Sequence, residues 1–522
     1  MRYLARGSSL ALSLLAAAQL PAQTSSWFTY NGNYESTRYS PLAQITPANA
    51  SSLHTVCTFD TNEQIASQSG PIVVNGTLYV TTDTSTYAID PTTCTLKWRT
   101  GRSYSPLGYL KNNHGVAYLD GRLFRVAGDV HAYSLDAATG RILWDVDVAK
   151  EKGEGAPMAP IAWNGMVFVA NAGGDAIGIR GHLHALDAND GHELWSFDVI
   201  PDTGAASRTW PSGADAVPPT GGGMWTSLTL DPVRGVLYVP TGNAGPDFMI
   251  HQRLGENLYT NSIVALDART GKFIDAIQTS RSDFHDWDVS AAPAVFTTRG
   301  GRRMLALAGK DGYVQGVIDK GGRLTHYYSV PTTSHVNTRV PLTHLRSTRF
   351  CPGTQGGSEW NGAAYNPGLN LVFVGAVDWC TSIRLVAPDS LKKPLDPSFT
   401  GAVGGGFGQL DPKEKWQGWI TAVNADAGAV SWKYRVATPV LAGVTSTGGN
   451  IVITGDMNGM LLVLNAVTGK LLYSGNAGGP IGGGVITYDV GGRQYIAAVN
   501  GSISPIWPLP AASSKVTVFG LP

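Results

Sequence analysis

The chain has 522 residues, of which 43% are hydrophobic and only 15% are charged, and its formal net charge at pH 7 is +0. It contains no block of basic residues, which argues against nucleic acid as a partner. The 64 glycines follow no collagen-like period and suit a fold with many tight turns. A chain of this length would ordinarily predict several domains, but internal repeats override that expectation.

The N-terminus has the pattern of a secretory signal peptide. Arg2 and Arg6 precede an apolar run over residues 10–20, which is too short to span a membrane. We therefore predict a signal peptide over 1–23 and a mature chain over 24–522 that is periplasmic or secreted. No later stretch is long and apolar enough for a transmembrane segment.

Four cysteines fit two disulfides in an oxidising compartment. Four cysteines allow three pairings. We favour Cys57–Cys94, because both residues lie in the first repeat region, and Cys351–Cys380 in a later one. The sequence has no CxxCH, which argues against a covalently attached c-type haem, and no CxxC pair with zinc-site spacing.

A short phrase recurs along the chain: an apolar pair, Asp or Asn, a few small residues, Gly, and then an aromatic residue. Each copy predicts a strand, a tight turn and a second strand. The aromatic residues Trp98, Trp144, Trp195 and Trp432 are expected to pack between neighbouring units. The copies cover 88–98, 134–144, 185–195, 265–275, 422–432 and 463–473, with a weaker copy at 317–327.

The spacing of the phrase predicts a β-propeller. Its Asp or Asn stands at positions 90, 136, 187, 267, 319, 424 and 465, so most intervals are close to the ~45 residues of one four-stranded blade. The long interval from 319 to 424 is expected to hold an eighth blade that has lost the phrase, marked by the strand over 368–377. Residues 515–519 could close the ring with the N-terminal segment. The predicted fold is all-β, a single eight-bladed propeller of four-stranded antiparallel blades.

Four segments interrupt the repeat and carry the candidate chemistry. They cover 167–181, 224–245, 282–293 and 305–314. Asp175, Asn243 and Asp288 lie near predicted strand ends within them, and carboxylate and amide oxygens suit a hard cation such as calcium. The alternative is that these Asx residues only form turns.

The same segments resemble the quinoprotein alcohol dehydrogenases, eight-bladed propellers that bind pyrroloquinoline quinone (PQQ), and the resemblance covers nearly all of the mature chain. It implies an enzyme that oxidises an alcohol to an aldehyde or ketone by hydride transfer to the quinone, with calcium. The most family-like stretches are WFTYNGNYESTRYSPLAQITPANASSL (27–53), CPGTQGGSEWNGAAYNPGLNLVFV (351–374), VTSTGGNIVITGDMNGMLLVLNAVTGKLL (444–472) and GRQYIAAVNG (492–501).

The resemblance implies roles for the catalytic and metal-binding residues. Asp288, which follows Trp287, matches the catalytic base and a metal ligand, with Asp286 as the second choice of base. Asn243 matches the asparagine ligand, and Asp175 stands where the family has a glutamate ligand. Lanthanide-using members carry a further Asp where this chain has Ser290, so calcium is the expected ion.

The resemblance also implies the cofactor-binding residues, with some departures. Trp225 matches the floor of the PQQ plane and Lys310 the cation at the quinone oxygen, and Glu359 of the 351–374 stretch is placed with them. Gly108 and Tyr109 replace a vicinal cysteine pair, and Tyr109 could stack on the quinone instead. The remaining two candidates are His114, which replaces an arginine, and Gln68, which replaces a glutamate.

The family implies an external electron acceptor, for which a separate periplasmic cytochrome c is the natural candidate. The substrate is an alcohol, small or polymeric. Two alternatives remain open: a PQQ-type propeller that serves only as a binding or assembly scaffold, and a quinoprotein sugar dehydrogenase.

Overall fold

The computed structural model describes residues 27–104, 111–213, 216–337, 339–391 and 395–522. The predicted signal peptide and the predicted cofactor contact Tyr109 lie outside these ranges. The described chain is almost entirely strand and turn. No helix in it is long and apolar enough to cross a membrane. Its helices are short 3-10 turns at Ala50–Ser52, Ser207–Thr209, Ile250–Gln252, Pro388–Ser390 and Lys413–Lys415.

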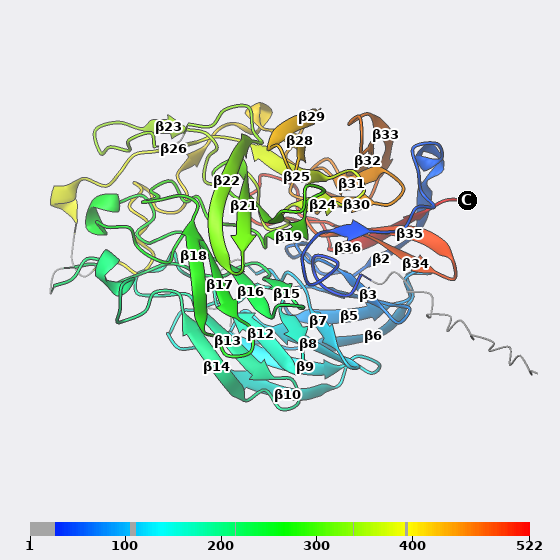
Figure 1. Cartoon of the computed structure of the whole chain (residues 1–522), viewed down its shortest axis with the longest axis horizontal. Coiled ribbons are helices and arrows are strands. Elements are labelled where there is room, and N and C mark those ends of the chain that lie inside the picture. The colour runs from blue at the N-terminus through cyan, green and yellow to red at the C-terminus, as the bar shows by residue number, and fades with distance from the viewer. Residues whose placement is uncertain (1–26, 105–110, 214–215, 338, 392–394) are drawn as a thin grey trace, which may run out of the picture.

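The strands of the described residues form seven sheets of four strands, one of five and one small sheet of three. Figure 1 shows the larger sheets following one another in chain order, from the blue β3 to the orange β33. We number these sheets as blades one to eight. Blades one to four contain β3 (Ile72–Val74), β4 (Thr77–Thr81), β5 (Ser85–Ile89) and β6 (Leu96–Gly101); β7 (Ala117–Leu119), β8 (Arg122–Val126), β9 (His131–Asp136) and β10 (Ile142–Asp147); β11 (Ile161–Trp163), β12 (Met166–Ala170), β13 (His182–Asp187) and β14 (Glu193–Asp198); and β15 (Thr229–Asp231), β16 (Val236–Pro240), β17 (Ser262–Asp267) and β18 (Phe273–Gln278).

Blades five to eight complete the ring. They contain β19 (Ala294–Thr297), β20 (Arg303–Ala308), β21 (Tyr313–Lys320) and β22 (Arg323–Pro331); β24 (Ala364–Asn366), β25 (Leu371–Asp378), β28 (Gln417–Asn424) and β29 (Ala429–Val436); β30 (Thr445–Thr447), β31 (Ile451–Gly455), β32 (Met460–Asn465) and β33 (Leu471–Asn476), with β1 (Tyr39–Ser40) parallel to β30; and β34 (Val485–Val490), β35 (Arg493–Asn500), β36 (Lys515–Gly520) and β2 (His54–Asp60). The first strands of several successive blades contact one another, β15 with β19, β19 with β24, and β24 with β30. These first strands therefore surround a common centre.

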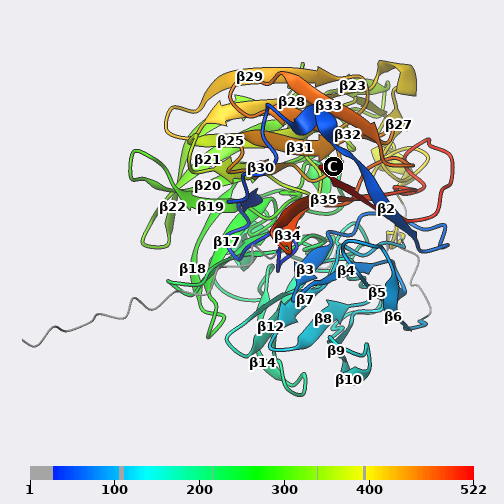
Figure 2. The same ribbon diagram turned by 90° about the vertical axis from the view of Figure 1, so that its right-hand side faces the viewer.

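The two ends of the chain close the ring. β2 pairs antiparallel with β36, with His54 opposite Gly520 and Asp60 opposite Lys515. Figures 1 and 2 both show the blue β2 beside the dark red strands from the C-terminal end. This confirms the expectation that residues 515–519 pair with the N-terminal segment. Closure removes the unpaired sheet edges that would otherwise invite association.

The total of eight blades agrees with the sequence, but the place predicted for the eighth blade is wrong. The strand predicted over 368–377 is β25, which pairs with β28 in the same blade as the copy at 422–432. The phrase always joins the third and fourth strands of a blade. In blade eight these are β36 and β2, which come from opposite chain ends and need no turn. The extra residues between 319 and 424 form loops and the small sheet of β23 (Thr348–Phe350), β26 (Thr381–Ile383) and β27 (Gln409–Leu410).

The repeated phrase joins neighbouring blades. The indole N–H of Trp98 donates to the carbonyl of Ala137 at 3.2 Å, directly after Asp136 of the next copy. Trp144 and Trp432 make the same bond to Ala188 and Ala466. A Cβ added at the glycine of each next copy would lie within 2.8 Å of the indole ring, so only glycine fits there. The pairs are Gly140 with Trp98, Gly191 with Trp144, Gly271 with Trp195 and Gly469 with Trp432.

Both predicted disulfides are present. Cys57 lies on β2 of blade eight and Cys94 lies in the turn of blade one, so this bond fastens the closing blade to its neighbour. Cys351 directly follows β23, and Cys380 lies between β25 and β26. This bond therefore joins the small sheet to the end of β25.

We predict that Gly469→Ala lowers the free energy of unfolding by about 1–3 kcal/mol, because the new methyl group would sit 2.6 Å from Trp432. The matched control is Gly121→Ala, which also has a positive φ but meets nothing within 4 Å. It should cost only its backbone strain, about 1 kcal/mol. Urea unfolding followed by tryptophan fluorescence measures both, and equal losses would contradict the packing role of the indole.

Candidate active site

One end of the ring gathers the segments that interrupt the repeat. Antiparallel pairing places the start of a blade's first strand beside the end of its second strand. Asp175, Asn243 and Lys310 follow second strands, whereas Trp225 and Asp288 precede first strands. All five therefore reach the same end of the ring, where they line one cavity with about 1020 Å³ of space not filled by protein atoms.

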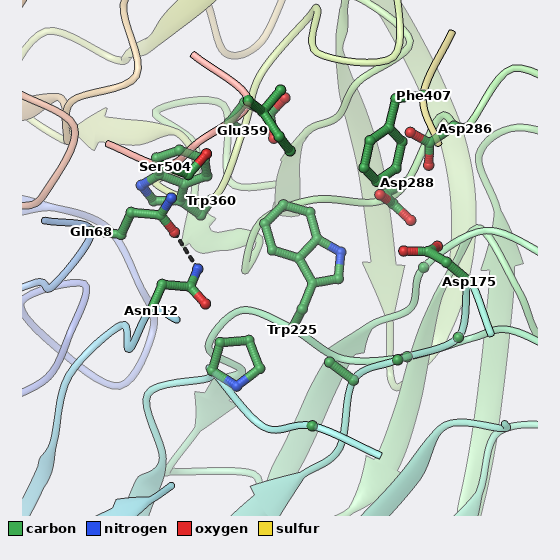
Figure 3. A pocket seen from close by; sticks show the side chains of 18 of the residues that line it. Gln68, Asn112, Asp175, Trp225, Asp286, Asp288, Glu359, Trp360, Phe407 and Ser504 are labelled. Carbon is green, nitrogen blue, oxygen red and sulfur yellow. Dashed lines mark hydrogen bonds between the residues drawn. The ribbon is translucent and has the colours of Figure 1, made fainter. Parts of the chain in front are cut away.

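Trp225 lies in the middle of this cavity (Figure 3). Asp175, Asp286, Asp288 and Phe407 lie on one side of its indole in that view. Gln68, Asn112, Ser504 and Trp360 lie on the other side. The cavity thus has an acidic end, a flat aromatic centre and an amide-rich end.

The acidic end contains three carboxylates that can share an ion. One oxygen each from Asp175, Asp247 and Asp286 lie within 4.8 Å of one another. Oδ2 of Asp247 is buried and has no hydrogen-bond partner among the described residues. Three oxygen ligands at this spacing form a suitable site for a hard divalent cation.

Residues 285–288, with the sequence His-Asp-Trp-Asp, direct two aspartates into the cavity. Asp286 and Asp288 line it, whereas His285 and Trp287 stack on each other with ring centroids 4.3 Å apart. Asp286 adopts a φ of +64°, a left-handed conformation that Asp tolerates better than most residues. His285 is further held by a 3.0 Å contact between Nε2 and the carbonyl of Val340. Aromatic packing therefore fixes the direction of both carboxylates.

Lys310 connects the acids to the aromatic centre. Its Nζ lies 2.8 Å from Oδ2 of Asp288, 3.2 Å from Oδ2 of Asp286 and 5.6 Å from the ring centre of Trp225. Burial opposes the charge on Lys310, but Asp286 and Asp288 outweigh it and raise the pKa of the ammonium well above its usual range. Lys310 is therefore a fixed positive charge at the edge of the indole.

Apart from Lys310, little positive charge lies near the buried carboxylates of this end of the cavity. Burial, followed by repulsion from Asp288, raises the pKa of Asp175 to about 6. Burial and neighbouring carboxylates also raise the pKa values of Asp247 and Asp286 well above their ordinary range. Arg253 is nearby, but its hydrogen bonds go to Asn257 and to backbone carbonyls. A bound divalent cation would relieve this repulsion.

Asn243 links two of the acids. Its backbone N–H donates to Oδ1 of Asp288 at 2.8 Å, and its side-chain Nδ2 donates to Oδ1 of Asp247 at 3.0 Å. A Cβ at the preceding Gly242 would lie 2.9 Å from Oδ1 of Asp288, so this approach requires glycine. Asn243 thus lies against the acid cluster and orients two carboxylates, and its role as a metal ligand stays a prediction.

The other end of the cavity is polar but uncharged. Gln68 donates from Nε2 to the carbonyl of Ile503 at 3.2 Å and accepts a bond from Nδ2 of Asn112. Glu359 also lines the cavity, but its charge interacts with Lys310 and Asp288. It is buried, its Oε1 has no partner among the described residues, and burial raises its pKa to about 8. At neutral pH Glu359 is therefore mainly protonated and can donate a hydrogen bond into the cavity.

His114 is the one described candidate that does not line the cavity. Its ring lies among those of Tyr30, Trp225 and Trp360, with centroids 6.0, 6.3 and 5.9 Å away. Neither ring nitrogen has a partner in the described chain. His114 is thus packed among aromatic rings beside the cavity, and its contact with the cofactor stays a prediction.

These residues fit PQQ and a cation. A flat indole face suits a planar quinone, Gln68 and Asn112 offer amide groups, and the unpaired oxygen of Asp247 faces a cluster of carboxylates.

Comparison with known proteins identifies the family. Residues 27–315 match the profile of the PQQ family described as "Glucose/ethanol/alcohol dehydrogenase, beta-propeller domain". Residues 417–506 match that of "Outer membrane protein assembly factor BamB". Since the first match spans more than half of the chain, the chain belongs to the PQQ dehydrogenase family of oxidoreductases. The expected family is confirmed.

Individual relatives agree with this assignment. The quinohemoprotein alcohol dehydrogenase ADH-IIG of Pseudomonas putida is 27% identical over 94% of this chain and 73% of its own length. A lanthanide-dependent methanol dehydrogenase of Methylacidiphilum fumariolicum is 27% identical over 92% of this chain and 86% of its own. The crystal structure of quinohemoprotein alcohol dehydrogenase from Comamonas testosteroni superposes with a TM-score of 0.82 at 25% identity and covers 96% and 81% of the two chains.

Sequence reasoning missed several residues of the cavity. Asp247 stands four residues after Asn243, and its place in the acid cluster follows from the turn around Pro246, which no pattern revealed. Asn112 lies shortly after Gly108 and Tyr109, where the chain departs from the family, and no pattern selected it. Trp360 follows the predicted Glu359 in the family-like stretch 351–374 but was not selected, and Phe407 and Trp507 come from segments without a readable motif.

We predict that His114→Phe makes the protein less sensitive to acid. Burial lowers the pKa of His114 to about 3, so between pH 6.5 and 3 the unfolded chain binds a proton that the folded chain does not. Stability of the wild type is thus lost as the pH falls below about 6.5, by about 1.4 kcal/mol per pH unit. Phe removes this contribution and fills the same aromatic space.

Urea unfolding at pH 7, 6 and 5 measures the difference, with wild type and the exposed-site variant His192→Ala as references. PQQ binding followed by quinone absorbance should be retained in His114→Phe. An unchanged pH dependence, or loss of PQQ binding, would contradict the buried and indirect position of His114.

Proposed function

We propose that this protein is a periplasmic, calcium- and PQQ-dependent alcohol dehydrogenase that passes electrons to an external acceptor. The observation that carries the proposal is the cavity, in which a flat indole lies between a carboxylate cluster and a set of amides. Family membership and the alcohol dehydrogenases among its relatives support the same activity. When bound, PQQ supplies the electrophilic quinone that accepts the substrate hydride.

The acid cluster would hold the cation. Asp175, Asp247 and Asp286 offer the three grouped oxygens, and Asn243 orients two neighbouring carboxylates. The predicted ligand set of Asp175, Asn243 and Asp288 is thus proposed in a wider form, with Asp247 and Asp286 added. The ion would act as a Lewis acid on an oxygen of the bound cofactor.

Asp288 is the proposed general base. It lies outside the three-carboxylate group, lines the cavity and pairs with Lys310 at 2.8 Å. Its Oδ1 accepts the N–H of Asn243 and its Oδ2 pairs with Lys310, so the carboxylate that would accept the alcohol proton is held in a fixed position. Lys310 would also place a positive charge where negative charge develops on the quinone.

Trp225, Gln68 and Asn112 would position the cofactor plane. The indole offers a broad apolar face, and the pair of amides can bond to the carboxylates of PQQ without adding charge. Glu359, protonated at neutral pH, can donate to an acceptor on the same ligand. Phe407 and Trp507 line the same cavity and are proposed to contact the alcohol.

A separate cytochrome c is the proposed electron acceptor, by analogy with the family. A quinoprotein sugar dehydrogenase remains the alternative, since the family description includes glucose dehydrogenases. A panel of alcohols and aldoses in the dye-reduction assay separates the two.

We predict that Asp288→Asn lowers turnover by about 10²–10⁴-fold, because the amide cannot accept the alcohol proton. The assay is dye reduction by purified protein reconstituted with PQQ and calcium, and quinone absorbance checks that the cofactor is still bound. The matched variant is Asp286→Asn, which should weaken calcium binding and recover activity at higher calcium. Recovery of Asp288→Asn by calcium, with no recovery of Asp286→Asn, would reverse the two roles.

We predict that chelator-treated enzyme regains activity with Ca²⁺ but not with La³⁺. Ser290 stands where lanthanide-using members carry an additional aspartate, and its hydroxyl donates to the carbonyl of Ser358 instead. Ser290→Asp should shift activation toward La³⁺ by adding a negative oxygen ligand. Activation of the wild type by La³⁺ at lower concentration than Ca²⁺ would count against the calcium assignment.

A further inference from the structure

A second group of metal-ligating side chains lies outside the cavity, on blade three. Glu151 and Glu154 belong to the loop between β10 and β11, and His182 begins β13. One ligand atom from each of the three lies within 4.8 Å of the others. None of the three residues lines the candidate active site.

The imidazole is held in the orientation of a metal ligand. Nδ1 of His182 lies 2.8 Å from Oδ1 of Asp198, which accepts its hydrogen and is itself bonded to Lys150. In the neutral ring Nε2 then carries the lone pair, and this nitrogen lies 3.8 Å from Oε1 of Glu151 and 3.8 Å from Oε1 of Glu154. A carboxylate that fixes the far nitrogen of a histidine is a common support of metal-binding imidazoles.

Hydrogen bonding within the protein does not account for this group. The side chain of Glu154 is fully buried and that of His182 is 2% exposed. Oε2 of Glu154 and Nε2 of His182 have no hydrogen-bond partner in the described chain. Oε1 of Glu154 accepts the backbone N–H groups of Lys150 and Glu151, and these are the only bonds its carboxylate makes among the described residues. Unpaired buried polar atoms of this kind are costly unless a ligand satisfies them.

We propose that Glu151, Glu154 and His182 bind a zinc ion, with water as the fourth ligand. Two ligands at about 2.1 Å from one tetrahedral ion are roughly 3.4 Å apart, close to the 3.8 Å separations seen here and beyond hydrogen-bond range. Zinc is commonly bound by imidazole nitrogen together with carboxylate oxygen. One imidazole and two carboxylates therefore suit zinc better than the three aspartates of the cavity, which offer only oxygen.

The charges around the group are compatible with a cation. Glu151 also accepts the backbone N–H of Arg180 and lies 3.3 Å from its guanidinium. Arg180 pairs in turn with Asp202 at 2.6 Å, and Lys150 pairs with Asp198, so both basic groups have a second acidic partner. The two glutamates therefore retain negative charge for an ion.

The position of the group gives the ion a structural role. Glu154 precedes Gly155, which bridges to Ala172 in the loop that leads to Asp175. The backbone of His182 bonds to Asn171 at the start of that same loop. A zinc ion here would fasten both segments behind the acidic end of the cavity. The proposal does not depend on the cofactor or on the reaction.

The test is zinc content and stability of the full-length protein as purified, with calcium in excess so that the acid cluster is occupied by calcium. After dialysis against a weak chelator, wild type should retain a single zinc ion per chain by elemental analysis. Glu154→Gln and Glu151→Gln should lose it. Glu151 is a quarter exposed, so its variant keeps the test valid if Glu154→Gln does not fold. The matched control is His192→Ala in the exposed cluster of Asp187, Asp190 and His192, and it should retain zinc.

Two further measurements separate this site from the acid cluster and from a simple ion pair. Zinc X-ray absorption should show imidazole nitrogen at about 2.0–2.1 Å, which the cluster of three aspartates cannot supply. Added zinc should raise the thermal midpoint of chelator-treated wild type in a concentration-dependent way, but not that of Glu151→Gln. Equal zinc content in wild type and Glu151→Gln, or a midpoint that does not respond to zinc, would overturn the proposal and leave a protonated His182 between carboxylates.

Discussion

The pairing of β2 with β36 is the interaction on which the rest of the structure depends. The groups of the candidate site come from several blades, with Asp175 on blade three, Asn243 and Asp247 on blade four and Lys310 on blade five. Only a closed ring brings the segment before blade one, which carries Gln68, to the cavity that also contains Lys310 of blade five. The Cys57–Cys94 bond holds β2 against blade one, and both of its cysteines lie on the N-terminal side of the junction, so the ring itself is closed by the backbone pairing of β2 with β36.

Closure of the ring also buries several carboxylates close together, which costs free energy. Moving an ionised carboxylate out of water costs several kcal/mol unless it is paired. The ring buries Asp175, Asp247, Asp286 and Asp288 together, and Lys310 pairs directly with only the last two. Such crowding destabilises the fold unless a cation is bound, and strain of this kind is typical of functional sites.

The sequence predicted the parts of the structure that follow a period. The repeated phrase fixed the packing of Trp98, Trp144 and Trp432 on the next blade, and it gave the number of blades. It misplaced the eighth blade, because a blade made from both chain ends needs no turn between its outer strands. Contacts made by irregular loops, such as those of Asp247 and Phe407, have no period and could not be predicted in this way.

The division of the chain between two family profiles bears on the choice between an enzyme and a scaffold. The profile of the assembly factor covers 417–506, where the chain contributes regular blades and no member of the acid cluster. The dehydrogenase profile covers 27–315, which contains Asp175, Asp247, Asp286, Asp288 and Lys310. A scaffold gains nothing from burying these charges together. A bound cation and a small ligand would account for the free-energy cost of burying these charges. The segments that interrupt the repeat are therefore the part of the chain that argues for catalysis.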